Sequence, residues 1–437
     1  MKKILNYIKN NKLLLYIIVN VLYIFVSSFL ATIVKCITFK DYGKSLIIAF
    51  ILNLIVSISI FIYHRFIKKD YKFKWCDLLL VFITIFAIIS LIFAERFDKA
   101  LYGEALRYEG IFALLYYLTL FYLSSFVNKK DKLKIVYVIL FTGFFQAMFA
   151  ILQKAQSPLV TTVKHHREIW AIGFTNNPNF LGSYMLMCLS ISYGLFIDEK
   201  DWVKKSLIYI VSIVILGGLL ASDTMSCIVG LFGIFGLLLI YSIRIKKYKE
   251  LLIIIISFIS LLFFFQKGRL THLVNDIIKT KNETIEISKG NVNDEYGTKR
   301  MVIWKETLKI VPKYLWHGVG IDNFAYAFNG KALTYKNLLF DKAHNEYLQI
   351  LVTQGIFSFI SYLLFYTLIV IDGFKNNFEK GKVYLILPVV GYLIQAFFNI
   401  SVIEVAPIFY ILLGLQIERN KKISKWYFCL LIFIIIV

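Results

Sequence analysis

The chain has 437 residues, of which 59% are hydrophobic and 17% aromatic, and its formal net charge is +22. A soluble globular protein is only about half apolar, so this composition excludes a water-soluble fold and indicates a polytopic membrane protein. Lys and Arg gather in short loops between apolar runs, which explains the positive charge without a nucleic-acid partner.

Apolar runs of membrane-spanning length follow one another along the chain. The first comes after a basic N-terminus and is too long for a cleaved signal peptide, so we interpret it as a retained span. Hydropathy predicts about twelve spans, at residues 13–34, 45–63, 77–94, 111–127, 134–152, 179–197, 206–222, 225–243, 250–266, 346–370, 383–401 and 403–417. The apolar tail, 426–437, is shorter than the roughly 20 residues needed to cross, and either forms a short span or lies at the interface.

These runs predict an all-α membrane domain of three consecutive parts. Residues 1–266 form an N-terminal bundle, 267–345 a long extracytoplasmic loop, and 346–437 the C-terminal helices. Basic loops fall on the side of the N-terminus if each run crosses once, and the positive-inside rule makes that side cytoplasmic. These loops are 64–74, 128–132, 200–205, 244–249, 375–382 and 419–425, and the small loop 35–44 is an exception.

Ionisable residues gather in the loops that this topology places outside. They include Arg107, Glu109, Arg300 and the segments 165–168 and 341–346, whereas the apolar cores hold almost none. Since charges inside a bilayer are costly and usually functional, this distribution favours chemistry or recognition at the outer face.

The long loop contains a segment with helical periodicity. From residue 300 to 315, Arg300, Trp304, Leu308 and Val311 share one face, while charged residues take another. We expect an amphipathic helix at the outer surface, with Trp304 at the headgroup level and its last turn disturbed by Pro312.

His344 lies where this loop turns into an apolar helix. Asp341 precedes a helix expected to start near Ala343, so it can cap that helix while His344 sits in the first turn. The partial positive charge of a helix N-terminus disfavours imidazolium, and a neutral imidazole is what a general base requires. The alternative is a boundary histidine that only caps the helix or reaches toward the interface.

Residues 173–179, Gly-Phe-Thr-Asn-Asn-Pro-Asn, predict another outer helix start. Pro178 suits the first helical position and Asn177 its cap, so free backbone N–H groups would point outward and favour an anion such as phosphate. The alternative is a well-made turn without a ligand.

Three arginines come from separate outer loops: Arg107, Arg167 and Arg300. Guanidinium groups offer paired donors that match phosphate, so the three together suit one pyrophosphate. Alternatively they are solvated or pair with nearby acids, for which the candidates are Glu109, Glu168 and Glu295. The sequence has no HExxH, Asp-x-Asp or CxxC pattern in these loops, so we expect no metal site.

The order of these motifs resembles that of the O-antigen ligase and polysaccharide polymerase superfamily, membrane glycosyltransferases of type C. The resemblance covers roughly residues 95–360, and its motifs are 107–110, 173–181, 300–304, 318–324 and 344–349 running on to Gly355.

The resemblance implies a bacterial cytoplasmic-membrane enzyme without cofactors that moves a glycan from a polyprenyl diphosphate, such as undecaprenyl diphosphate. The acceptor at the outer face would be a glycan, lipid or protein. By position, Arg167 and Arg300 would hold the diphosphate with help from Arg107. His344 would activate the acceptor hydroxyl for displacement with inversion at the sugar. The residues that shape the site would be Asn177, Asn179, Trp304 and Asn345.

Ligase and polymerase members share these motifs, so a capsule or wall polysaccharide polymerase is an open alternative to a ligase. A transporter or flippase of lipid-linked sugars is a second alternative, and a non-catalytic scaffold for polysaccharide assembly is a third. Transporters tend to carry charges or broken helices at mid-membrane depth, and the charges of this chain lie near the outer edge instead.

Overall fold

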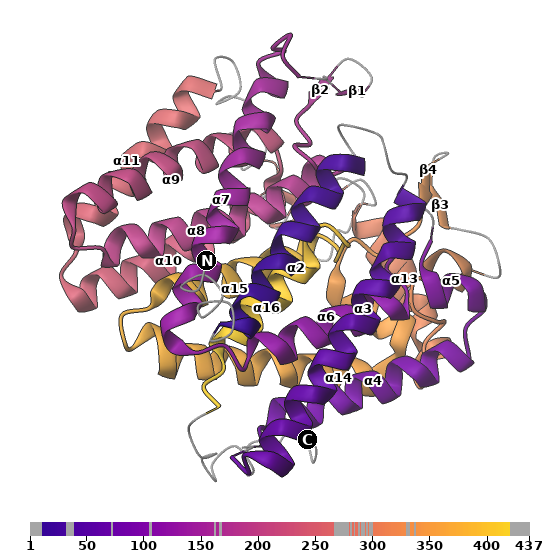
Figure 1. Cartoon of the computed structure of the whole chain (residues 1–437). Helices are drawn as coiled ribbons and strands as arrows, with labels where there is room; N and C mark the ends of the chain where they lie inside the picture. Colours follow the sequence, from indigo (N-terminus) through magenta and orange to yellow (C-terminus); the bar gives the residue numbers. More distant parts are fainter. Residues whose placement is uncertain are drawn as a thin grey trace.

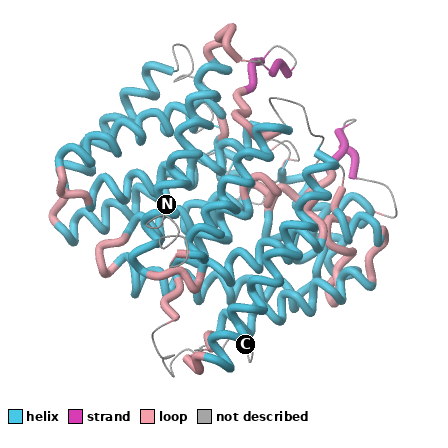
Figure 2. Tube along the Cα trace, in the orientation of Figure 1, coloured by secondary structure: helices cyan, strands magenta, loops and turns pink. Residues whose placement is uncertain are grey.

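The structure is a computed structural model that describes residues 11–31, 39–70, 73–104, 107–160, 163–165, 168–265, 300–328, 333–335 and 338–419, with isolated positions between 266 and 299. It is almost entirely helical, as predicted, with two short β-hairpins (Figures 1 and 2). The α-helices are α2 (Lys12–Phe29), α3 (Phe39–Ile62), α4 (Trp75–Ile92), α5 (Phe97–Tyr102), α6 (Ile111–Ser124), α7 (Lys129–Lys154), α8 (Pro178–Asp198), α9 (Trp202–Ser222), α10 (Met225–Ile245), α11 (Tyr248–Phe265), α13 (Arg300–Tyr314), α14 (Glu346–Gly373), α15 (Val383–Gln395) and α16 (Ala406–Gln416).

The hairpins were not predicted. They pair β1 (Val163–His165) with β2 (Glu168–Trp170) and β3 (Leu333–Tyr335) with β4 (Leu338–Phe340). Short π-helical turns extend α3 (Tyr63–Ile67) and α14 (Phe374–Phe378), and 3-10 turns cover Phe324–Ala327 and Ala396–Phe398.

Every predicted apolar run coincides with a helix over most of its described length. Within the described ranges, eight helices are long and apolar enough to cross a membrane, and the apolar helices α6, α15 and α16 are shorter. The chain is therefore a multi-pass membrane protein, while the count of twelve crossings and the orientation stay predictions. The tail 426–437 lies outside the described residues.

Helix α8 is the centre of the bundle. Residues 180–197 of this helix are all buried, and the helix packs against α7, α9, α10 and α15. Small residues allow this close approach, because a Cβ on Gly194 would lie 2.5 Å from the Cα of Tyr384 in α15. Helix α8 as a whole is thereby fixed by its neighbours inside the bundle.

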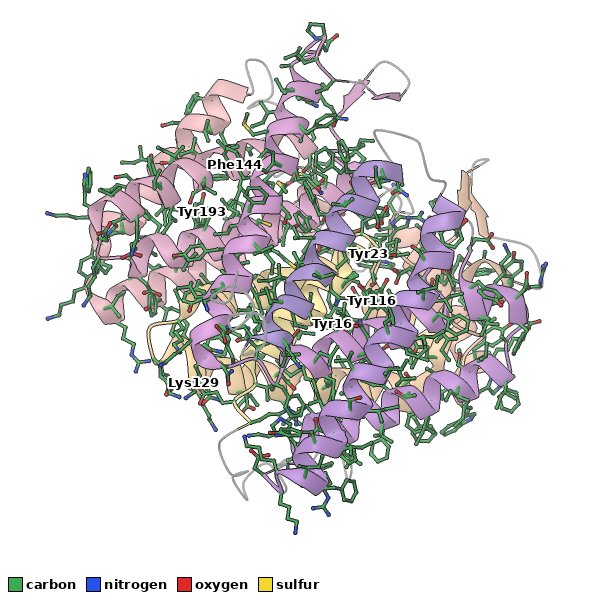
Figure 3. All side chains as sticks on the ribbon, viewed as in Figure 1. Tyr16, Tyr23, Tyr116, Lys129, Phe144 and Tyr193 are labelled. Carbon is green, nitrogen blue, oxygen red and sulfur yellow. The ribbon has the colours of Figure 1, made fainter. Side chains whose placement is uncertain are left out.

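The elements that form the candidate site gather at one end of the bundle. Both hairpins lie toward the upper right in Figure 1, α5 and α13 lie at the right of the same view, and Lys129, at the start of α7, lies at the lower left in Figure 3. The predicted helix over 300–315 is confirmed as α13, and Pro312 lies inside its last turn without ending it.

The predicted apolar face of α13 is partly wrong. Leu308 is 56% exposed, whereas Val302, Ile303 and Thr307 are buried. The side chains of Val302 and Ile303 pack with Phe324 and other apolar residues into a small core beside α14. The buried face of α13 therefore packs against the core beside α14. The 3.6-residue period alone did not specify which face this would be.

An interruption in α14 holds the loop that follows α13. Gly355 has a φ of +81°, so the helix opens there, and the backbone of Val352 and Thr353 accepts hydrogen bonds from Val319 (2.9 Å) and Gly320 (3.0 Å). We expect Gly355→Ala to lower the midpoint of thermal unfolding, because the left-handed backbone disfavours a side chain and the new Cβ would lie 2.8 Å from a backbone oxygen of Trp316.

The matched control for this prediction is Gly236→Ala. Gly236 lies within α10, and an added Cβ would meet nothing within 4 Å. Alanine favours a helix over glycine there, so this variant should unfold at the same or a higher temperature. An equal loss in both variants would contradict the role of the Gly355 opening.

Candidate functional site

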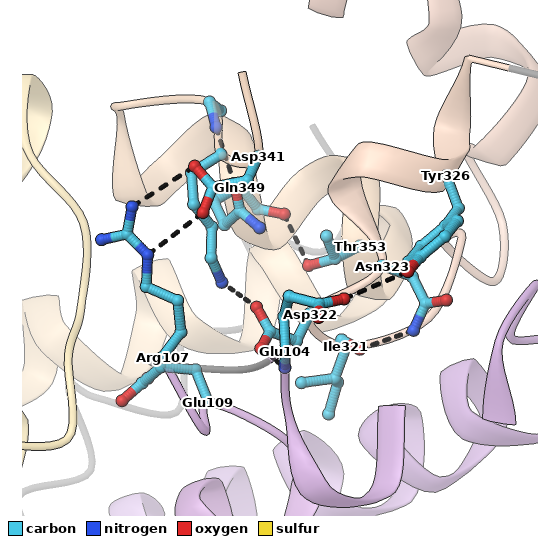
Figure 4. A network of polar contacts seen from close by, with 12 residues as sticks. Glu104, Arg107, Glu109, Ile321, Asp322, Asn323, Tyr326, Asp341, Gln349 and Thr353 are labelled. Atoms are coloured by element: carbon cyan, nitrogen blue, oxygen red, sulfur yellow. Dashed lines mark hydrogen bonds and ion pairs between the residues drawn. The ribbon is translucent and has the colours of Figure 1, made fainter. Parts of the chain in front are cut away.

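Three loop segments meet at the end of the bundle that carries α13, and polar contacts join them (Figure 4). Lys342 forms an ion pair with Asp322, and the same aspartate accepts a hydrogen bond of 2.6 Å from the backbone N–H of Glu104. Tyr326 Oη donates to Glu104 at 3.1 Å. The segments that carry Glu104, Asp322 and Lys342 are therefore fixed to one another.

Arg107 belongs to this network. Its guanidinium makes a two-pronged contact with Asp341, with Nε–Oδ2 at 3.1 Å and Nη2–Oδ1 at 3.3 Å. Burial alone would raise the pKa of Asp341, but the charges of Arg107 and Lys342 hold that pKa below its ordinary value. The partner of Arg107 is thus Asp341, which the sequence had suggested as a helix cap.

His344 lies just before α14 rather than in its first turn. Asn345 caps α14, its side chain accepting from the backbone N–H of Leu348 at 3.0 Å, and His344 has a left-handed φ of +48°. The expectation of a helix from Ala343 capped by Asp341 is therefore wrong. An N-cap takes an extended backbone and a side-chain oxygen, and Asn345 supplies both.

Two contacts fix the residue before His344. The Trp304 indole Nε1 donates to the carbonyl of Ala343 at 3.1 Å, and the Ala343 N–H donates to Gln349 Oε1 at 2.9 Å. The Trp304 ring also lies beside Phe397 and Phe398, with centroids 6.3 and 6.2 Å apart. Trp304 thus positions the segment that carries His344, a more specific place than the headgroup level expected of it.

The surroundings of His344 keep its imidazole neutral. Burial and, after it, the positive charge of Arg300 lower its pKa to about 4, although the Asp341 carboxylate opposes the shift. Burial also lowers the pKa of Arg300. Desolvation and a neighbouring cation thus favour the neutral imidazole that the sequence argument had ascribed to a helix dipole.

The N-terminus of α8 reaches the same region. Pro178 is its first residue and the Asn177 side chain caps it, accepting from the N–H of Asn179 at 2.9 Å, as predicted. The Arg107 guanidinium lies 5.5 Å from the ring centre of Phe180 in the first turn of α8. The carbonyl of Asn179 accepts from Asn399 at 3.3 Å, which ties α8 to the segment before α16.

Arg300 approaches the first turns of α8 through α10. Its charge interacts with Cys227 of α10, and the Cys227 sulfur lies 2.8 Å from the position that a Cβ on Gly182 of α8 would take. The structure therefore brings Arg107, Arg300, His344 and the α8 terminus together. Arg167 lies outside the described residues.

A small cavity between the start of α14 and the segment that carries Asp322 was not foreseen. Its volume is about 70 Å³, and Glu109, Asp322, Lys342, Glu346 and Gln349 line it with others. Burial raises the pKa of Glu109 to about 7, although Tyr117 donates a hydrogen bond of 2.5 Å to its carboxylate. Burial also raises the pKa of Glu404 to about 7. Nothing in the local sequence distinguishes these buried acids from solvated ones, because their burial is tertiary.

The comparison with protein families agrees with the geometry. Residues 210–363 match the family model described as O-antigen ligase, a range that includes α10, α13, Arg300, His344 and the start of α14. The comparison with curated proteins gives no match. The match supports the predicted O-antigen ligase superfamily, and the chain is a multi-pass membrane protein with an O-antigen ligase domain at residues 210–363.

Proposed function

We propose that the chain transfers a glycan from a polyprenyl diphosphate to an acceptor hydroxyl at the outer membrane face, with inversion at the sugar and without a metal ion. The observation that carries the proposal is the placement of a neutral imidazole, His344, beside two guanidinium groups, Arg107 and Arg300. A base and a cationic cradle for a departing phosphate are the two things that this reaction needs.

Each of these residues has its own role in the proposed reaction. His344 removes the proton of the acceptor hydroxyl, the acceptor oxygen forms a bond to the anomeric carbon, and the bond from that carbon to the diphosphate breaks. Arg300 and Arg107, beside the positive end of the α8 dipole, stabilise the charge on the departing polyprenyl diphosphate. Arg107 must share its guanidinium with Asp341 or exchange partners when the diphosphate binds. We include Arg167 with this set by position.

Purified protein with a polyprenyl-diphosphate glycan and an acceptor tests the proposal through release of the carrier. Arg300→Ala should lower this release at least tenfold, because charge-assisted hydrogen bonds to a phosphate contribute about 1.5–3 kcal/mol. Arg300→Lys should recover part of it, since the charge returns without the paired donors.

Arg96→Ala is the matched control. Arg96 is an arginine at the same end of the molecule, and its side chain is half exposed and pairs with Asp98. Full carrier release in Arg300→Ala, or an equal loss in Arg96→Ala, would reject the role of Arg300. The lengths of the products separate a ligase from a polymerase of the same superfamily, because only repeated transfer to the growing chain gives a ladder.

A further inference from the structure

An apolar groove that shares no residue with the candidate site lies between α3 and α4. Both helices pack against α6, and α4 also packs against α14. The groove has a volume of about 650 Å³ and is lined largely by apolar side chains, among them Ile58, Phe61, Leu80 and Val81. Several of these are substantially exposed, so the groove opens to the surroundings of the bundle.

Two polar side chains in this lining have no partner among the described residues. Ser57 is 8% exposed, and its hydroxyl makes no hydrogen bond there. Arg65 lies in the π-helical turn that ends α3, and no ion pair within the described ranges engages its guanidinium. The nearby Asp77 is already held by Arg419, at 2.7 and 3.0 Å, so it does not neutralise Arg65.

The spacing of these two groups suits a glycerophospholipid. Eight residues of helix separate Ser57 from Arg65, which is about 12 Å along the axis. Side chains on a helix lean toward its N-terminus, so the Arg65 side chain leans toward Ser57. A phosphate and the ester carbonyls below it would meet a guanidinium first and a hydroxyl donor deeper in the groove.

We propose that this groove binds one glycerophospholipid with an anionic headgroup. Its acyl chains cover the apolar lining, an ester carbonyl accepts from Ser57, and its phosphate receives the paired donors of Arg65. A choline headgroup would place a second cation beside Arg65.

Native mass spectrometry of the full chain in detergent, with added phosphatidylglycerol or phosphatidylcholine, tests the proposal. The unaltered protein should retain phosphatidylglycerol preferentially. Arg65→Gln should reduce that retention about fivefold, the effect of one basic residue at an anionic lipid surface, and reduce retention of phosphatidylcholine less, so that the preference between the two lipids narrows. Arg65 is exposed, so thermal unfolding in detergent should not change.

Two further variants distinguish the contribution of the headgroup to lipid retention from that of the groove. Arg244→Gln removes an arginine from the last turn of α10, outside the groove lining, and should behave as the unaltered protein. Val81→Trp should fill the groove and lower retention of both lipids. Equal retention of the two lipids by the unaltered protein, an undiminished preference in Arg65→Gln, or a lipid-free species of twice the mass would overturn the proposal.

Discussion

His344→Ala is expected to lower carrier release by roughly 10²–10⁴-fold, the usual contribution of a general base. His344→Gln should lose nearly as much, because it restores volume and polarity but accepts no proton at neutral pH. Retention of the donor lipid should change little in either variant, since the arginines remain. Carrier release at saturating donor, together with donor binding measured separately, checks this expectation.

The pH profile gives an independent reading of the same group. Because burial and Arg300 lower the pKa of His344 to about 4, the base form is complete at neutral pH and is lost only as the pH falls through that value. Carrier release should therefore be level from pH 8 to about 6 and decline below about 5. In Arg300→Gln the residual activity should decline at a higher pH, because a neighbouring positive charge has been removed.

Unchanged release by His344→Ala at every pH would refute the assignment of the base. An acid decline near pH 6.5 that Arg300→Gln leaves in place would show that a solvated group, not this buried imidazole, controls the rate. Folding also depends on this histidine. Its pKa is lower in the folded chain than in the unfolded chain, so the folded state loses stability as the pH drops from about 6.5 toward 4.

Local physics made much of this molecule predictable. Runs of apolar residues gave the helices, and the pair Asn177-Pro178 gave the start of α8, because capping depends on adjacent residues only. The period of residues 300–315 gave α13 as well. Which face of α13 is buried depends on the core beside α14, and the sequence does not show that core. The prediction therefore placed Leu308 on the wrong side of the helix.

Long-range partners account for what was missed. Asp341 and Asn345 are both able to cap a helix, and Asp341 instead pairs with Arg107, which lies 234 residues away in the chain. The acids around the small cavity, Glu109 and Glu346, come from different helix starts and meet only in the folded bundle. The sequence placed these charges near the outer edge but carried no signal that they would be buried together.

The buried pair of Lys342 and Asp322 gives the largest expected effect on stability. The two side chains are 5% and 0% exposed, and they join the segment that carries His344 to the loop after α13. Lys342→Met would leave the Asp322 carboxylate buried without its cation, which costs about 3–5 kcal/mol. We expect a lower midpoint of thermal unfolding in detergent and, because His344 lies two residues away, a lower rate of carrier release.

The double variant Lys342→Met with Asp322→Asn distinguishes the loss of a partner from the loss of the pair. Asparagine keeps an acceptor for the backbone N–H of Glu104 and removes the charge that has no partner. It should therefore recover much of the unfolding midpoint that Lys342→Met loses, since replacing both members of a buried ion pair is often close to neutral. If the losses of the two single variants simply add, the two charges do not stabilise each other, and another contact must hold His344 beside Arg300.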